Sequence, residues 1–349
     1  MLLKTEVLTR HYKGSEIPAL NNVSLTVNEG EIVCLAGESG SGKSTLLRLI
    51  AGLDVPDGGK VFIEDQVISD GHRLVPPEKR GVGMVFQDYA LFPHMNIRRN
   101  IGFGLRGMPK SEKNFRIDEM LELLHMTGMD KRYPHELSGG QCQRVAVARA
   151  MAPKPKVMLF DEAFCGLDRQ LRDIILQEVR SLLKKTGMTA ICVTHDISDA
   201  LHIADRLAIL RHGELLQFDS PVAIYDQPFN AYIAGFFGET NLVRATKQDN
   251  SWWCDFGCLT DLNDAIEQEE LLFSLRPQDL LVAQNNKGDD HGLRATVTRV
   301  CFIGHCVELI CQASSGVCYR AHISAEKTFV EGEVVFLTAN VRRLRSLSS

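Results

Sequence analysis

Apolar residues fall into short runs and alternating patterns over the first two-thirds of the chain. Residues 23–27 alternate between apolar and polar, the period-two pattern of a strand with one exposed face. Residues 32–36, 157–160 and 189–193 are short apolar runs, which are typical of buried strands in a parallel sheet. Apolar residues within 171–183 recur at helical spacing, with charges between them. This alternation predicts an α/β domain with a mostly parallel sheet.

Two segments depart from that pattern. Residues 89–135 show helical periodicity, which predicts a mostly helical insertion. Beyond residue 239, short apolar strands alternate with Gly, Asn and Asp turns such as 285–290, which predicts a small β barrel or sandwich. The strands expected there are 252–256, 271–276, 293–302, 307–311, 318–323 and 334–339. We therefore expect two domains, 1–239 and 240–349.

Composition narrows the class of protein. A chain of 349 residues with 44% hydrophobic and 24% charged residues is globular and long for one domain. Its net charge of -5 argues against nucleic acid as a partner. Residues 1–6 lack the apolar core of a signal peptide, and no window is apolar enough to span a membrane. The 10 cysteines then predict free thiols in a reducing compartment, and those of the tail match no common zinc spacing.

The stretch from Gly37 to Thr45 reads GESGSGKST and fits the phosphate-loop pattern G-x-x-x-x-G-K-[ST]. Because it joins a buried strand to a predicted helix, its backbone N–H groups would cradle phosphate at the N-terminus of that helix. Lys43 would reach the β/γ-phosphates, and the Ser44 hydroxyl would bind magnesium. The predicted nucleotide contacts are Gly37, Glu38, Ser39, Gly40, Ser41, Gly42, Lys43, Ser44 and Thr45.

Further candidate residues lie at the ends of predicted strands and at one helix start. The strand 157–160 ends in Asp161, expected to hold magnesium through its water shell, and Glu162, expected to polarise an attacking water. His195 follows the strand 189–193 and is expected to contact the γ-phosphate. The helix start is a second predicted anion site, made of Ser138, Gly139, Gly140 and Gln141. Ser138 can also be the N-cap of this helix, and both roles can hold together.

Together these motifs resemble the ATP-binding cassette subunit of an ABC transporter, continuously over residues 4–235. The resemblance implies a P-loop NTPase fold with a helical subdomain and an enzyme that hydrolyses ATP with Mg²⁺. It makes 137–141 the signature sequence and 165–168 the D-loop. The resemblance also places Gln87 at the Q-loop, which makes Gln87 both a magnesium ligand and a catalytic residue. Tyr12 falls at the aromatic position that stacks on adenine.

A narrower resemblance is carried by residues 76–80 and 83–94, which are similar to importer cassettes for ferric iron, sulfate, polyamines and sugars. Residues 275–279 and the β-rich tail resemble the transport-associated, OB-like regulatory domain of that group. The resemblance implies a homodimer bound to permease subunits, served indirectly by a substrate-binding protein. The subunit would be peripheral, on the cytoplasmic face of the inner membrane. Ferric iron is the favoured substrate, with sulfate, polyamines and sugars as alternatives.

Some positions differ from the family pattern: Glu38, Cys142, Ala163, Cys165 and Gly166. None removes a predicted ligand, but they leave the rate and the communication between subunits open. Two other functions remain as alternatives. One is a soluble ABC protein of translation or DNA repair, although such proteins usually carry two cassettes or long coiled coils. The other is an ATP-binding regulator with little turnover, against which the presence of Glu162 and His195 argues.

Overall fold

The computed structural model describes residues 1–166, 168–248, 251–259, 269–284 and 292–347. The chain divides into two compact units, Met1–Pro221 and Val222–Ser349. The predicted D-loop residue 167 and the predicted turn at 285–290 lie outside the described residues. The functional boundary after residue 239 stays a prediction.

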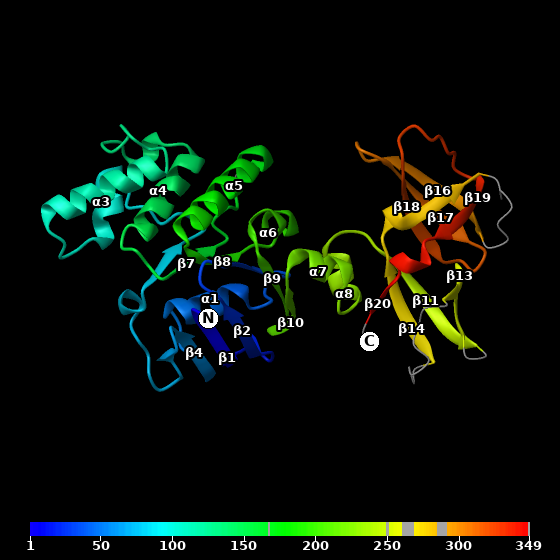
Figure 1. Ribbon diagram of the computed structural model, residues 1–349, viewed down its shortest axis with the longest axis horizontal. Coiled ribbons are helices and arrows are strands. Elements are labelled where there is room, and N and C mark those ends of the chain that lie inside the picture. The colour runs from blue at the N-terminus through cyan, green and yellow to red at the C-terminus, as the bar shows by residue number, and fades with distance from the viewer. Residues whose placement is uncertain (167, 249–250, 260–268, 285–291, 348–349) are drawn as a thin grey trace. The chain divides into compact units, whose positions relative to one another are not determined.

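The first unit contains two sheets (Figure 1). The smaller sheet is antiparallel and consists, in spatial order, of β2 (Leu20–Val27), β1 (Leu3–Arg10), β4 (Gly58–Ile63) and β5 (Gln66–Ser69). The larger sheet consists of β10 (Glu214–Asp219), β9 (Arg206–Arg211), β3 (Ile32–Ala36), β8 (Thr189–Val193), β7 (Val157–Asp161) and β6 (Val82–Val85). All its neighbours are parallel except β10, which forms a hairpin with β9. The predicted α/β fold with a mostly parallel sheet is confirmed.

Helices of the first unit include those predicted after the phosphate loop, within 89–135, after residue 138 and within 171–183, and one, at 197–203, that was not predicted. They are α1 (Lys43–Ala51), α2 (Ile97–Ile101), α3 (Lys110–Leu123), α4 (Gly139–Met151), α5 (Arg169–Thr186) and α6 (Ile197–Ile203), with 3₁₀ turns η1 (Pro77–Lys79), η2 (Gly102–Gly104) and η3 (Pro134–Glu136). α2 and α3 confirm the predicted helical insertion, and Figure 1 shows α3 grouped with α4 and α5. Asp168 caps α5 by accepting a hydrogen bond from the Leu171 N–H at 3.0 Å. Among the described helices, none combines the length and apolar character that a membrane span requires.

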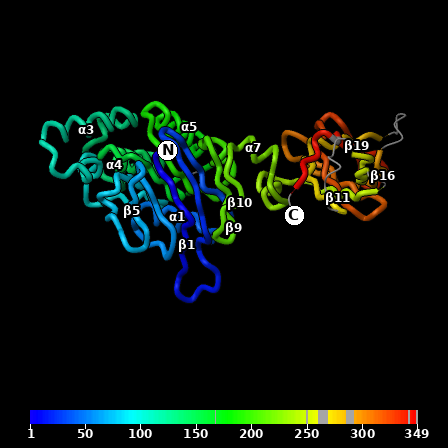
Figure 2. The backbone as a smooth tube through the Cα atoms, turned by 60° about the horizontal axis from the view of Figure 1, so that its bottom comes forward, coloured from blue at the N-terminus to red at the C-terminus, as the bar shows by residue number. Residues whose placement is uncertain are grey.

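One hydrophobic core joins the two sheets of the first unit to α1. Leu46, Leu47 and Ile50 of α1 have no exposed surface, and they belong to the same cluster as Leu8 of β1 and Leu159 of β7. Burying one such side chain contributes about 1.5–3 kcal/mol to folding. This packing fixes the start of α1, and with it the phosphate loop, against the ends of the central strands. Figure 2 shows the connection between β1 and β2, which carries Tyr12, projecting beyond these strands.

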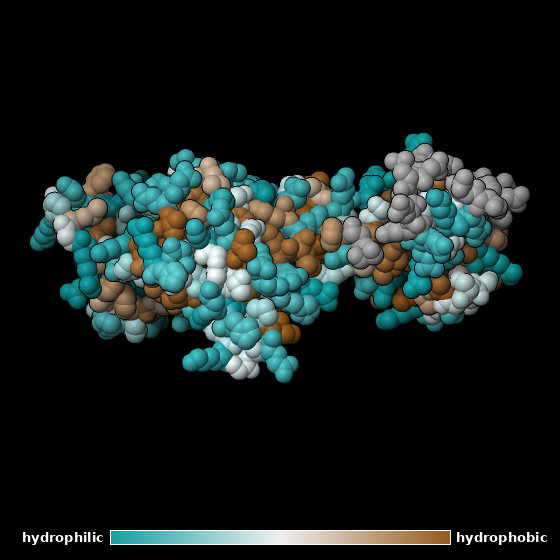
Figure 3. Space-filling model, turned by 90° about the horizontal axis from the view of Figure 1, so that it is seen from below, coloured by the Kyte–Doolittle hydropathy of each residue, from teal (hydrophilic) through white to brown (hydrophobic). Residues whose placement is uncertain are grey.

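The second unit is mainly β. It begins near α7 (Pro221–Asp226) and α8 (Ala231–Phe236), and its first antiparallel sheet consists of β13 (Gly257–Leu259), β12 (Ser251–Cys254), β11 (Asn241–Gln248), β14 (Glu270–Leu275) and β20 (Arg345–Leu347). The second sheet consists of β15 (Leu280–Ala283), β19 (Val334–Ala339), β16 (Leu293–Phe302), β17 (Val307–Ala313) and β18 (Cys318–Ile323), with 3₁₀ turns η4 (Pro277–Asp279) and η5 (Val341–Arg343). Both sheets enclose one core around Trp252 and Tyr319, as predicted for an OB-like domain. In Figure 3 hydrophilic residues dominate each unit's visible surface.

Candidate active site

The phosphate loop follows a path that only glycine permits at several positions. Gly37, Gly40 and Gly42 have φ values of 147°, 81° and 102°. A Cβ atom at Gly37 would lie 2.1 Å from the Leu210 carbonyl oxygen, and one at Gly42 would lie 2.3 Å from the Ala19 carbonyl oxygen. The glycines therefore let the loop pack directly on neighbouring backbone while it turns into α1.

Lys43 is held over this loop. Its side chain is buried, and Nζ donates hydrogen bonds to the carbonyl oxygens of Gly37 at 2.9 Å and Glu38 at 2.8 Å. Burial lowers the pKa of Lys43, and the carboxylates of Glu162 and Asp161 oppose that shift. An ammonium group beside a turn of backbone N–H groups at a helix start is chemically suited to bind phosphate.

Two oxygen-bearing side chains meet next to Lys43. Ser44, in the first turn of α1, donates a hydrogen bond from Oγ to Oδ1 of Asp161, the last residue of β7, at 2.9 Å. Hydroxyl and carboxylate oxygens are ligands that Mg²⁺ accepts, so this pair fits the predicted magnesium site. Gln87 lies with Asp161 and Arg48 in the wall of a cavity of about 540 Å³. The structure thus brings all three predicted magnesium residues to one region.

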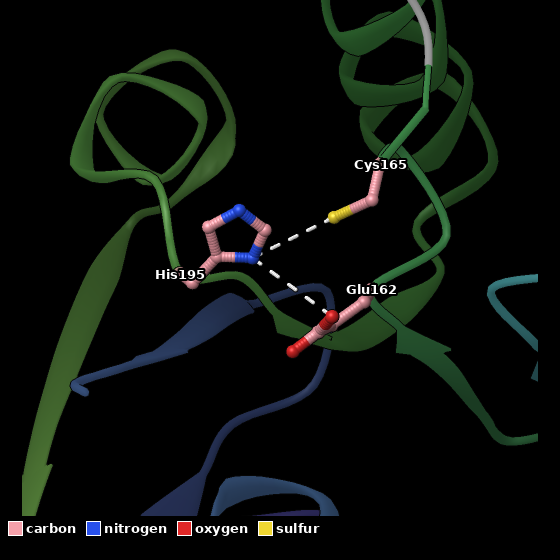
Figure 4. A group of neighbouring side chains, drawn as sticks. All are labelled: Glu162, Cys165 and His195. Atoms are coloured by element: carbon pink, nitrogen blue, oxygen red, sulfur yellow. Dashed lines mark hydrogen bonds and ion pairs between the residues drawn. The ribbon is translucent and has the colours of Figure 1, made fainter. Parts of the chain in front are cut away.

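Glu162 and His195 face each other across the ends of β7 and β8 (Figure 4). The distance from His195 Nδ1 to Glu162 Oε2 is 3.8 Å. Glu162 has a φ of 48°, a left-handed conformation that costs energy in residues other than glycine and that is common at functional sites. Its N–H group donates to the Val193 carbonyl oxygen at 3.2 Å, which fixes the backbone at this position.

Cys165, which the sequence did not assign to the site, lies both in the wall of the cavity and next to His195. Cys165 lines the cavity with Gln87, and its Sγ lies 3.7 Å from His195 Nδ1. Burial, followed by the charge of Glu162, raises the pKa of the Cys165 thiol to about 11. The only sequence signal was that a cysteine here departs from the usual D-loop residue.

The predicted signature residues form a capped helix start. Ser138 Oγ accepts a hydrogen bond from the Gln141 N–H at 3.4 Å, and Gln141 Oε1 accepts one from the Ser138 N–H at 3.1 Å. A Cβ atom at Gly140 would lie 2.9 Å from Ile175 Cδ1, so a side chain here would require the end of Ile175 to shift. Ser138 and Gly139 are exposed. Across the described parts of the chain, no hydrogen bond or ion pair joins this helix start to the phosphate loop.

Tyr12 is held by neighbours of its own. Its hydroxyl donates to Asp54 Oδ2 at 2.7 Å, and the Arg10 guanidinium lies 4.8 Å from the centre of its ring. The side chain is 36% exposed, so part of the ring is accessible to a planar ligand. As with the signature residues, none of its hydrogen bonds within the described structure reaches the phosphate loop.

Comparisons with known proteins agree on one family. A family model described as ABC transporter matches residues 20–165. The spermidine/putrescine import ATP-binding protein PotA of Vibrio cholerae is 37% identical over 91% of this chain and 85% of its own length. The Fe(3+) ions import ATP-binding protein FbpC of Pseudomonas fluorescens is 41% identical over 88% and 85%. A dimeric, post-hydrolysis structure of the ATP-binding cassette MJ0796 with ADP and Pi is 36% identical, with a TM-score of 0.55, and covers 63% of this chain and 98% of its own.

Proposed function

This chain belongs to the family of ATP-binding subunits of ABC importers, and from that membership we propose how its residues act on ATP. The resemblance found in the sequence is confirmed by relatives that cover most of the chain. Subunits of this family bind and hydrolyse ATP to drive solute import, and they work as dimers with permease subunits.

We propose that the region around Lys43 is the catalytic site. The observation that carries this is the hydrogen bond between Ser44 and Asp161 beside the Lys43 ammonium group. The loop from Gly37 to Thr45 and Lys43 hold the phosphates; Ser44, Asp161 and Gln87 hold Mg²⁺, which would neutralise charge on the phosphate oxygens. Glu162 orients the attacking water, and His195 contacts the γ-phosphate.

A second copy of the chain completes the site in this proposal. The signature, from Ser138 to Gln141, begins with two exposed residues at the start of α4 and forms no hydrogen bond to its own phosphate loop within the described structure. In a head-to-tail homodimer, this helix start closes over the phosphates held by the partner. Each composite site then contains one phosphate loop and one signature, and the Tyr12 ring stacks on adenine.

Ferric iron is the substrate we propose first, and the place of action is the cytoplasmic face of the inner membrane, beside permease subunits and a substrate-binding protein. Support comes from the FbpC relative, whose name specifies Fe(3+) import, although PotA and the sulfate/thiosulfate import protein CysA 1 of Agrobacterium fabrum are similarly close. The transported solute contacts the permease rather than this chain, so the nucleotide site does not distinguish these substrates.

We expect cells that lack the gene for this chain to lose uptake of radiolabelled ferric iron. The wild-type gene should restore uptake, whereas a Glu162→Gln gene should not, because import requires hydrolysis. Putrescine and sulfate uptake, measured in the same cells, serve as controls. Loss of one of those instead, or unchanged uptake of all three, would contradict the choice of iron.

The tail, residues 240–349, is proposed to regulate transport or prolong the dimer. Its core is separate, since the described core residues of the first unit all precede residue 219. A chain ending at Glu239 should therefore fold and bind ATP with Mg²⁺ as the full chain does, while dimer lifetime or regulation changes. Nucleotide titration of both chains, with circular dichroism to verify folding, tests this. A folded, monodisperse short chain that cannot bind ATP would show that the division of labour is wrong.

A further inference from the structure

Three different metal-binding groups meet at the proposed catalytic site, which already includes two of them (Figure 4). The donor atoms of Glu162, Cys165 and His195 all lie within 4.8 Å of one another. A carboxylate, a thiolate and an imidazole are the ligand types that Zn²⁺ prefers. Tetrahedral zinc with bonds of about 2.0–2.3 Å places its ligand atoms about 3.3–3.6 Å apart. The separations from His195 Nδ1, 3.7 Å to sulfur and 3.8 Å to oxygen, are close to those values.

The surroundings favour a divalent cation. Asp196 and Asp199 contribute negative charge near Cys165, in addition to Glu162. Arg172 is the opposing cation and lies 3.3 Å from Asp196 and 3.7 Å from Asp199. Asp196 and Asp199 thus pair with this guanidinium group, while the Glu162 carboxylate acts on the Lys43 ammonium group, so three carboxylates lie near two cations. His195 is exposed and Glu162 and Cys165 are half-buried, so an ion can enter from solvent.

We propose that Glu162, Cys165 and His195 form an inhibitory site for Zn²⁺ or a similar thiol-binding divalent cation, with water in the fourth position. On binding, the Cys165 thiol transfers its proton to solvent and the thiolate coordinates the ion, so affinity rises with pH. The Glu162 carboxylate donates to the ion and no longer orients water. The inhibition rests on the catalytic roles proposed for Glu162 and His195, whereas the binding does not.

Binding is tested on the full-length chain with Co²⁺, which replaces zinc and gives a thiolate-to-metal charge-transfer band. We expect one Co²⁺ per chain with this band, displaced by Zn²⁺. Cys165→Ser and His195→Gln each remove a direct ligand and should weaken binding at least as much as the loss of an outer-shell partner does, about 10–100-fold. Cys318→Ser is the matched control, because Cys318 is an exposed cysteine of the second unit. The cobalt charge-transfer band should persist in this variant. A band that persists in Cys165→Ser would overturn the site.

Inhibition is tested by phosphate release at fixed MgATP with increasing Zn²⁺. Each rate is compared with the rate of the same variant without zinc. We expect Zn²⁺ to suppress the wild-type chain and Cys318→Ser equally, and the half-inhibiting concentration to rise at least about tenfold in Cys165→Ser. Stoichiometric cobalt binding without inhibition by zinc would contradict the inhibitory role. Absence of phosphate release from the wild type with MgATP and without zinc would contradict the proposed catalytic function, while the cobalt band still decides the zinc site.

Discussion

Replacing Glu162 with glutamine is expected to suppress ATP hydrolysis by about 10²–10⁴-fold, the usual contribution of a positioned general base. The amide keeps the shape of the side chain but loses the charge that orients the water. Nucleotide binding should remain, because Lys43 and the loop are unchanged, and ATP-bound dimers should accumulate. Phosphate release and ATP titration on the same preparation measure both effects.

Glu64→Gln is the matched control for this change. Glu64 is also a left-handed glutamate, with φ 49° against 48° for Glu162, but it is exposed and pairs with Lys156 at the surface. Any effect of the amide on a left-handed backbone is therefore common to both variants. Near-normal turnover by Glu162→Gln would remove Glu162 from its catalytic role.

Replacing Lys43 with alanine is expected to weaken ATP binding itself. A hydrogen bond to a charged group contributes about 1.5–3 kcal/mol, so loss of one corresponds to a rise in Kd of roughly 10–150-fold. Lys156→Ala is the control, because this lysine forms an exposed ion pair with Glu64. Titration with a fluorescent ATP analogue gives both values, and unchanged affinity in Lys43→Ala would place the phosphates elsewhere.

The sequence identified those parts of the site that depend on local chain geometry. The glycine spacing of the phosphate loop, the strand before it and the helix after it all lie within twenty residues of one another. The carboxylates of Asp161 and Glu162 were recognisable because they directly follow a buried apolar strand. The hydrogen bond between Ser44 and Asp161 then follows from the place of β7 in the sheet beside α1.

Other features depend on packing that no local pattern encodes. β1 was missed because its pattern is interrupted at Val7, which has a φ of 48° where the pairing with β2 shifts register. The approach of Cys165 to His195 arises because β7 and β8 are parallel neighbours, with Asp161 opposite Val193. Thirty residues of sequence separate the two side chains, so only the sheet order brings them together.

Roles that involve a second molecule cannot be inferred from the sequence pattern or from the structure of one chain. Ser138 is exposed, and in the described structure its capping partner Gln141 comes from its own helix. The closure of the signature over the phosphates of a second chain is therefore proposed. Replacing Ser138 removes the cap of α4, at a cost of about 0.5–2 kcal/mol, and a large side chain at this exposed position would obstruct a partner's nucleotide. Ser138→Arg is accordingly expected to bind ATP and fail to hydrolyse it.

Mixing two inactive chains tests the composite site most directly. Lys43→Ala and Ser138→Arg chains are each expected to release little phosphate alone. In a mixed dimer, one site combines the intact phosphate loop of the Ser138→Arg chain with the intact signature of the Lys43→Ala chain. Phosphate release should therefore reappear on mixing and depend on the proportion of the two chains. If mixed dimers form but remain as inactive as the separate variants, the site is not shared between two chains and the account is wrong.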